Sequence, residues 1–232
     1  MSSIADNIRS VTRRIQKATE SAGRPAGSVA LLAVSKTRPA AEIREAAAAG
    51  QHAFGENYLQ EALDKIGELG DVHGLQWHFI GPIQSNKTRP IAENFDWVHS
   101  VDRLKIARRL SEQREAHRPP LNICLQVNID NEDSKAGCLL SELPQLATAV
   151  SSLPNICLRG LMAIPDPDQS EENLRLSFHR LAEALAELRR QPGIEAPLDT
   201  LSMGMSSDLE VAIAEGASWV RVGTALFGER QR

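Results

Sequence analysis

The sequence predicts an α/β protein built as a single-domain (β/α)8 TIM-type barrel. Short runs of β-branched and aromatic residues alternate with helix-like segments along the chain. Strands that alternate with helices pair in parallel through right-handed crossovers, and eight such units in about 200 residues point to a closed barrel. No Gly-x-Gly-x-x-Gly turn follows the first strand, which disfavours the competing open, doubly wound sheet.

An extra helix is predicted before the first strand. Residues 4–18 place apolar side chains at steps of three and four, the spacing of an amphipathic helix, and Gly23 and Pro25 follow it. After the eighth predicted strand only residues 223–232 remain, which are too few for a full closing helix. We therefore expect the N-terminal helix to fill that gap in the outer ring.

The remaining elements follow from the change between period-two and helical patterning. The predicted strands are residues 29–34, 52–54, 77–80, 97–101, 122–129, 156–163, 199–202 and 219–222. The predicted helices between them are residues 39–49, 57–68, 84–93, 102–116, 140–151, 171–190 and 207–215. No linker or low-complexity tract divides the chain, so residues 1–232 are expected to form one domain.

Composition excludes several classes of function. The net charge is −4 and the arginine pairs are scattered, so nucleic acid is not an expected partner. Three cysteines without a Cys-x-x-Cys spacing are typical of core thiols in a reducing compartment. The six histidines show no metal-binding spacing, and no apolar window approaches a membrane span. We expect a cytoplasmic protein with no metal and no membrane partner.

Lys36 follows the first predicted strand and precedes Pro39, so its amine lies at the carboxyl end of that strand. Active sites of such barrels are built at this end. Partial desolvation among apolar neighbours favours the neutral amine, which can attack an aldehyde to form a Schiff base. A lysine at a strand end can also simply extend its stem along apolar surface into water. The neighbouring residues must decide between these two roles.

Small-residue turns follow the seventh and eighth strands, where barrels of this type commonly hold phosphate. The first turn carries the Ser206 hydroxyl ahead of a helix N-terminus, which suits an anion. Ser207 and Glu210 match a capping box, so Ser207 would cap that helix and leave Ser206 available. The second turn contains Gly223 and Thr224. Two such turns on consecutive strands predict a phosphate site.

Arg221 alternates with apolar neighbours on the eighth strand, so its side chain should point into the barrel mouth or interior. Strand eight pairs with strand one in a closed barrel, which makes Lys36 and Arg221 neighbours beside the phosphate site. An amine nucleophile there suits a phosphorylated aldehyde. Pyridoxal 5′-phosphate and the phosphosugar substrates of Schiff-base aldolases both meet this description. A structural arginine paired with an acid is the alternative for Arg221.

Other strand ends are polar too. Asn57 or Asn128 could hydrogen-bond a ring hydroxyl, and turn chemistry explains either residue equally well. Lys87 and Lys135 lie near the predicted mouth and could take part in cofactor exchange, although a solvated surface lysine also accounts for each.

Several of these residues lie in blocks that match a known family. The blocks are Leu-Ala-Val-Ser-Lys (32–36), Phe-Gly-Glu-Asn-Tyr (54–58), Trp-His-Phe-Ile-Gly (77–81), Gln-Ser-Asn-Lys (84–87), Leu-Ser-Met-Gly-Met-Ser (201–206), Val-Arg-Val-Gly-Thr (220–224) and Phe-Gly (227–228). Together they resemble the pyridoxal-phosphate homeostasis proteins, also called the YggS or PROSC family. The likeness covers nearly the whole chain, and its blocks are long and specific.

The resemblance implies a barrel similar to the N-terminal domain of alanine racemase, with Lys36 holding pyridoxal 5′-phosphate as an aldimine. It further implies that Ser206, Gly223 and Thr224 contact the phosphate and that Arg221 faces the pyridine nitrogen. We add Asn57 to this cofactor-binding set. No catalytic residue and no metal ligand is expected.

An arginine can only donate, so it favours an unprotonated pyridine nitrogen and weakens carbanion chemistry. Racemisation also needs a second base on the opposite face of the cofactor. The racemases bring a tyrosine from a second domain, which we expect this chain to lack, and Tyr58 is the only tyrosine here.

We therefore expect a pyridoxal phosphate binding protein that acts in vitamin B6 and amino-acid/keto-acid homeostasis by buffering or delivering the cofactor. Substantial racemase activity is not expected. The predicted form is a monomer, with pyridoxal-phosphate-dependent apo-enzymes as possible recipients. The alternatives are a small racemase-like enzyme and, third, a phosphosugar aldolase, which would need carboxylates or a second lysine converging on Lys36.

Overall fold

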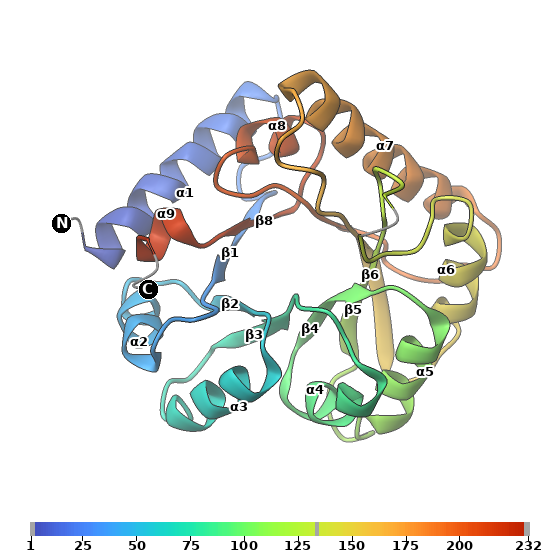
Figure 1. The fold of residues 1–232 in the computed structure, drawn as a ribbon, viewed down its shortest axis with the longest axis horizontal. Helices are drawn as coiled ribbons and strands as arrows, with labels where there is room; N and C mark the ends of the chain where they lie inside the picture. The colour runs from blue at the N-terminus through green and yellow to red at the C-terminus, as the bar shows by residue number, and fades with distance from the viewer. Residues whose placement is uncertain (1–2, 133–134, 230–232) are drawn as a thin grey trace.

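A closed barrel of eight parallel strands forms the centre of the protein (Figure 1). The structure is a computed structural model, and it describes residues 3–132 and 135–229. The strands follow one another around the barrel in chain order, and β8 pairs with β1 to close it. The prediction of a single α/β domain with a TIM-type (β/α)8 barrel is confirmed.

The strands are short and mostly buried. They are β1 (Ala30–Val34), β2 (Ala53–Glu56), β3 (Gln76–Phe79), β4 (Trp97–Val101), β5 (Leu121–Gln126), β6 (Ile156–Met162), β7 (Thr200–Ser202) and β8 (Trp219–Val222). Every predicted strand overlaps an observed one. The largest difference is at the end of β5, because the chain there leaves the ladder for a loop in which Val127 forms only an isolated bridge with Cys138.

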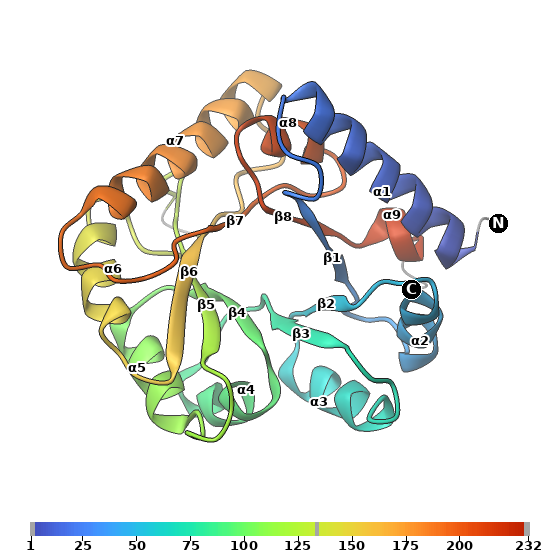
Figure 2. The same cartoon turned by 180° about the vertical axis from the view of Figure 1, so that it is seen from behind.

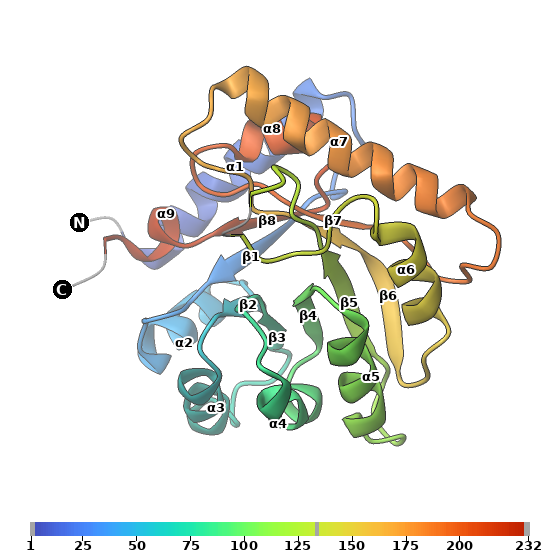
Figure 3. The same ribbon diagram turned by 45° about the vertical axis from the view of Figure 1, so that its right-hand side comes forward.

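Helices cover the outside of the barrel (Figure 2). They are α1 (Ile4–Ser21), α2 (Ala40–Ala48), α3 (Leu59–Glu68), the 3-10 turn η1 (Ser85–Lys87), α4 (Thr88–Asn94), α5 (Leu104–Gln113), α6 (Leu143–Ser151), α7 (Glu171–Arg190), α8 (Leu209–Ala214) and α9 (Thr224–Phe227). The predicted helix over residues 84–93 is thus divided into η1 and α4. The long helix α7 packs against β6, β7 and α8 (Figure 3).

The N-terminal helix takes the place of a closing helix, as expected. Ser3 caps α1 in a capping box with Asp6, and the buried face of α1 presents Ile8, Val11 and Ile15. This face packs on α8, α9 and α2, next to the seam between β1 and β8 (Figures 1 and 2). Each fully buried aliphatic side chain stabilises the fold by about 1.5–3 kcal/mol, so α1 is part of the core. Within the residues that the structure describes, the short helix α9 is the only helix after β8.

The predicted capping of α8 by Ser207 is wrong. Helix α8 begins at Leu209 with Asp208 at the N-cap position, and no side chain caps it. The Asp208 carboxylate accepts a hydrogen bond from the backbone N–H of Met205 at 2.5 Å. Glu210 forms an ion pair with Arg14 of α1 at 2.9 Å. The expected capping box is therefore absent, because Asp208 rather than Ser207 takes the N-cap position and Glu210 pairs with Arg14.

The interior of the barrel is partly polar. Trp97 of β4 and Trp219 of β8 have ring centroids 6.0 Å apart, and His78 of β3 lies 4.9 Å from Trp219. Because β4 lies opposite β8 in the barrel, these rings must meet across its centre. The Arg159 guanidinium carbon lies 4.8 Å from the centroid of the Trp97 ring, and Arg159 Nη2 pairs with Asp199 Oδ2 at 2.7 Å. Aromatic rings and imidazoles thus occupy part of the interior that aliphatic layers usually fill.

Candidate functional site

A cavity of about 290 Å³ opens at the carboxyl ends of the strands. Each of the six predicted site residues contributes to its wall. The wall consists of Val34, Lys36, Arg38, Asn57, Ile80, Met162, Ile164, Met205, Ser206, Ser207, Arg221, Gly223 and Thr224. These residues are far apart in the sequence, and the closure of the barrel brings them together.

Lys36 lies in a tight turn directly after β1. Ser35 at the start of the turn is fully buried, and the N–H of Arg38 donates to the Ser35 carbonyl at 3.0 Å. Thr37 has φ +63°, in the left-handed region. A β-branched residue rarely adopts this conformation, which costs about 1–3 kcal/mol. The turn that presents Lys36 to the cavity is therefore strained.

Arg221 reaches the cavity from β8, where it is in register with Leu32 of β1. Its Nη1 donates to the Ser202 carbonyl at 2.6 Å and to the Ser202 Oγ at 2.8 Å, and its Nη2 donates to the Ala163 carbonyl at 2.9 Å. Burial lowers the pKa of Arg221 to about 10, and it remains a cation at neutral pH. The alternative of a structural arginine held by a carboxylate is not what the described residues show, since each of these acceptors is a carbonyl or a hydroxyl.

A hydrogen-bonded chain runs from Arg221 into the barrel interior. The Ser202 Oγ lies 2.7 Å from His99 Nδ1, and His99 Nε2 lies 2.9 Å from His78 Nδ1. Burial lowers the pKa of both imidazoles, that of His78 to about 3, so both are neutral. Arginine only donates, so the Ser202 hydroxyl can donate a hydrogen bond to His99 Nδ1, and His99 Nε2–H then donates to His78 Nδ1. We assign this direction because it satisfies every side-chain polar atom of Ser202, His99 and His78 except His78 Nε2.

The turns after β7 and β8 form one side of the cavity. Gly204 has φ +91°, and a Cβ there would lie 2.5 Å from the Ala212 Cβ, so only glycine fits. The Ser206 carbonyl accepts a hydrogen bond from Arg14 of α1 at 3.1 Å. Gly223 and Thr224 of the second turn lie at the start of α9 and also line the cavity. Ser206, Ser207 and Thr224 are the hydroxyl-bearing residues of these two turns in the cavity wall, and Arg221 lines the same cavity.

Asn57 contributes an acceptor without a partner. Its Oδ1 is buried and makes no hydrogen bond to the part of the chain that is described. The backbone of Asn57 packs so closely on Gly81 that a Cβ at residue 81 would lie 2.1 Å from the Asn57 carbonyl oxygen. A buried acceptor that needs a donor fits a ligand with a hydroxyl group.

Asn128 has a different role. Its Nδ2 donates to the carbonyl of Glu132 at 2.7 Å, and its Oδ1 accepts from the Glu132 N–H at 3.2 Å. Both ends of the amide are thus used within the loop after β5, and Asn128 is not part of the cavity wall. Between the two asparagines the structure favours Asn57 as the ligand-facing residue.

Comparison with known proteins relates the chain to a family. A family model described as "Alanine racemase, N-terminal domain" matches residues 3–231. The pyridoxal phosphate homeostasis protein of Pseudomonas aeruginosa is 64% identical over 230 residues, which are 99% of this chain and 97% of the relative. That of Escherichia coli strain K12 is 53% identical over 234 residues, covering 99% and 98% of the two chains.

The chain belongs to the pyridoxal phosphate homeostasis protein family. The predicted resemblance is therefore confirmed. Among solved structures, PipY of Synechococcus elongatus with pyridoxal phosphate bound matches with a TM-score of 0.85 and 41% identity over 97% of this chain and 100% of that chain. Alanine racemase of Corynebacterium glutamicum matches with a TM-score of 0.71 and 20% identity over 98% of this chain and 61% of that chain, a likeness of fold.

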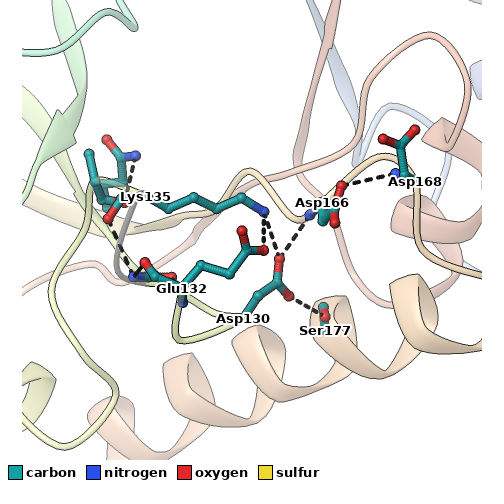
Figure 4. A network of polar contacts seen from close by, with 9 residues as sticks. Asp130, Glu132, Lys135, Asp166, Asp168 and Ser177 are labelled. Atoms are coloured by element: carbon teal, nitrogen blue, oxygen red, sulfur yellow. Dashed lines mark hydrogen bonds and ion pairs between the residues drawn. The ribbon is translucent and has the colours of Figure 1, made fainter.

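In this member of the pyridoxal phosphate homeostasis family, the two further lysines considered for cofactor exchange, Lys87 and Lys135, are not part of the cavity wall. Lys87 is exposed on η1. Lys135 forms ion pairs with Asp130 at 3.0 Å and Glu132 at 2.8 Å (Figure 4). The expectation of a solvated surface lysine is wrong for Lys135, because the loop after β5 folds its own carboxylates around the ammonium group.

Sequence reasoning missed part of the wall and all of its support. Met162 and Ile164 at the end of β6, and Met205 before Ser206, give the cavity an apolar side. Ser202 and His99 support Arg221 from behind. A polar residue within a buried strand was the available signal for His99, but its partner is 103 positions away in the sequence.

Other groups of residues give no sign of further chemistry. Within residues 3–132 and 135–229, no set of three or more His, Cys, Asp or Glu side chains is arranged to hold a metal ion. In the same ranges, none of the helices combines the length and hydropathy needed to cross a bilayer. The three cysteines are free thiols, and burial raises the pKa of Cys124 and Cys138.

Proposed function

We propose that this protein binds pyridoxal 5′-phosphate in the cavity at the barrel mouth and buffers or delivers it in vitamin B6 and amino-acid/keto-acid homeostasis. The observation that most strongly supports this proposal is that the six residues predicted from the sequence to bind this cofactor all border one cavity. Its relatives are named for pyridoxal phosphate homeostasis, and PipY holds pyridoxal phosphate in its solved structure.

The residues present fit the chemical groups of the cofactor. The Lys36 amine would hold its aldehyde carbon, and the buried Asn57 Oδ1 would accept a hydrogen bond from its ring hydroxyl. Ser206, Gly223 and Thr224 would hold its phosphate through hydroxyls and backbone N–H groups. When bound, the cofactor supplies an electrophilic carbon joined to a conjugated ring.

Arg221 sets the electronic environment of the site. Its Nε–H and one Nη2–H have no hydrogen-bond partner among the described residues, and the side chain lines the cavity. Facing a pyridine nitrogen, a cation that only donates would keep that nitrogen unprotonated. A ring held in this form is a weak electron sink, which suits storage of the cofactor better than carbanion chemistry.

Among the described residues, none that could act as a second base borders the cavity. Within the described wall, the only ionisable side chains are Lys36, Arg38 and Arg221. Arg38 is held by the Gly228 carbonyl and lies over the Phe227 ring, and an arginine does not accept protons. Tyr58 is 54% exposed outside the wall. We infer that catalysis is weak, and that a small racemase-like enzyme is the less supported alternative.

Hydrogen exchange at a bound amino acid distinguishes the two functions. The cofactor-loaded protein is incubated with L-alanine in heavy water, and deuterium at the α-carbon is followed by NMR. Buffering predicts exchange little faster than with the free cofactor. Exchange at enzyme-like rates that disappears in Lys36→Ala would instead support the racemase-like enzyme.

The protein is also proposed to act as a cytoplasmic monomer that passes the cofactor to apo-enzymes. A mass of 25.4 kDa in light scattering, unchanged by pyridoxal phosphate, is the expected result for the monomer. A dimer at micromolar concentration would contradict it.

A further inference from the structure

The turn that holds Lys36 is supported by a buried cluster of charges that the cofactor site itself does not use. Lys65 projects from α3 and its side chain is 6% exposed. Its Nζ donates to the Ser35 carbonyl at 2.8 Å, to Glu56 Oε1 at 2.8 Å and to Glu61 Oε1 at 2.5 Å. Three acceptors, from the turn after β1, from β2 and from α3, thus converge on one buried ammonium group.

Glu56 at the end of β2 is the second member of the cluster. Its side chain is fully buried, and the Ser35 Oγ donates to its Oε1 at 2.6 Å. Ser35 is therefore held twice, through its hydroxyl by Glu56 and through its carbonyl by Lys65. Both contacts act on the residue immediately before Lys36.

Glu61 holds the residue on the other side. The backbone N–H of Thr37 donates to Glu61 Oε1 at 2.5 Å, the same oxygen that accepts from Lys65. Thr37 is the residue with φ +63°. Strained backbone of this kind persists only where the surroundings over-determine it, and it gathers at functional sites. The cluster provides these restraining contacts on both sides of Lys36.

Stability alone does not account for this arrangement. Burying a lysine and a glutamate costs desolvation energy, and a well-packed apolar pair of similar volume often serves stability as well or better. Each of the three charged side chains also makes a hydrogen bond to Ser35 or Thr37 of the strained turn. These contacts fix the position of Lys36.

We propose that Lys65, Glu56 and Glu61 form a clamp that holds residues 35–37 in the strained turn and so positions the Lys36 amine in the cavity. The clamp residues are positioning residues, because they act through the turn. This inference rests on the proposed function, in which the Lys36 amine holds pyridoxal phosphate.

The test uses Glu61→Ala, which removes the acceptor of the Thr37 N–H and leaves the buried Lys65–Glu56 pair intact. The partly exposed Glu61 should tolerate this change without loss of folding. Affinity for pyridoxal phosphate is measured by absorption titration, with thermal unfolding of the unloaded protein as a check on folding. Glu68→Ala, an exposed glutamate on the same helix, is the matched control. We expect about tenfold weaker binding in Glu61→Ala and wild-type binding in the control.

A second change separates positioning from general destabilisation. Glycine adopts the left-handed conformation without strain, so Thr37→Gly added to Glu61→Ala should recover most of the lost affinity. A double variant, Glu56→Gln with Lys65→Met, removes both buried charges together and should also bind weakly while melting near the wild-type temperature.

The outcomes are distinguishable. If the wild type takes up pyridoxal phosphate on Lys36 while Glu61→Ala and the double variant bind it as tightly, the clamp is wrong and the proposed function stands. If the affinity falls but Thr37→Gly does not recover it, positioning by the clamp is likewise wrong. If the wild type itself takes up no pyridoxal phosphate on Lys36, the proposed function fails and the clamp fails with it.

Discussion

At the scale of single residues, Arg221 is the side chain whose chemistry most constrains the site. Its guanidinium group is fixed by two carbonyls and the Ser202 hydroxyl, and that hydroxyl continues into two neutral histidines. A group held from three directions keeps its remaining N–H groups in one orientation. Arg221 therefore presents a fixed positive donor to the cavity.

Arg221→Glu should change the absorption spectrum of the bound cofactor and its dependence on pH. A carboxylate would stabilise a protonated pyridine nitrogen, whereas the arginine opposes protonation. Spectra of the loaded wild type and variant, recorded between pH 5 and 9, give the measurement, and thermal melting of the unloaded variant shows whether it folds. Identical spectra in a folded, loaded variant would mean that Arg221 does not face the pyridine ring of the cofactor.

Ser206→Ala combined with Thr224→Ala should weaken the binding of pyridoxal phosphate and leave the fold intact. Ser206 is half-buried and Thr224 exposed, so neither hydroxyl supports the core. Hydrogen bonds to a charged group contribute about 1.5–3 kcal/mol each, so the affinity should fall at least about tenfold. The measurement is the affinity for pyridoxal phosphate compared with that for pyridoxal, which lacks the phosphate. A preference for the phosphorylated form that is unchanged in the variant would place the phosphate elsewhere.

At the scale of elements, one carboxylate joins the loops after β5 and β6 to helix α7. Asp130 Oδ2 accepts from the Asp166 N–H at 2.8 Å and pairs with Lys135, and Asp130 Oδ1 accepts from the Ser177 hydroxyl at 2.9 Å (Figure 4). The loop after β6 also carries Ile164 of the cavity wall. The contact thus connects the shape of the cavity mouth to α7.

Asp130→Asn should make the protein less stable at pH 7 by about 1–3 kcal/mol. Burial alone would raise the pKa of Asp130, but its hydrogen bonds with Asp166, Lys135 and Ser177 outweigh it and lower the pKa. A lowered folded pKa stabilises the protein above the unfolded value of about 3.9, and this contribution disappears as the pH falls through the folded pKa. The difference in unfolding free energy between wild type and variant, measured in denaturant, should therefore shrink below about pH 4. A difference that is constant from pH 7 to pH 3 would contradict the assignment.

Local patterning predicted the elements well and their ends less well. Each strand was predictable because β-branched runs bounded by turn residues are a short-range signal. The start of α8 was not, because Asp208 rather than Ser207 takes the N-cap position and Glu210 forms an ion pair with Arg14 of α1. The division of residues 84–93 into η1 and α4 likewise depends on tertiary contacts, such as Arg109 bonding to the Ser85 carbonyl at 2.8 Å.

At the scale of the whole molecule, barrel topology explains why the six residues of the cavity wall could be chosen from the sequence. Every parallel strand brings its carboxyl end to the same face, so residues that follow strands converge there whatever their spacing. No such rule governs the second layer of contacts. Lys65 reaches the Lys36 turn from α3, and His99 reaches Ser202 across the barrel, and neither contact has a short-range signature. The residues of the cavity wall could be predicted from the sequence, whereas the residues that hold them in place could not.

The most direct test of the account is to locate the cofactor on the chain. The protein is loaded with pyridoxal phosphate, reduced with borohydride, digested and analysed by mass spectrometry, with Lys36→Ala treated in parallel. The account predicts one added cofactor per chain, on the peptide that contains Lys36, and no stoichiometric addition in the variant. Modification centred on Lys87 or Lys135, or a wild type that takes up no cofactor, would contradict it.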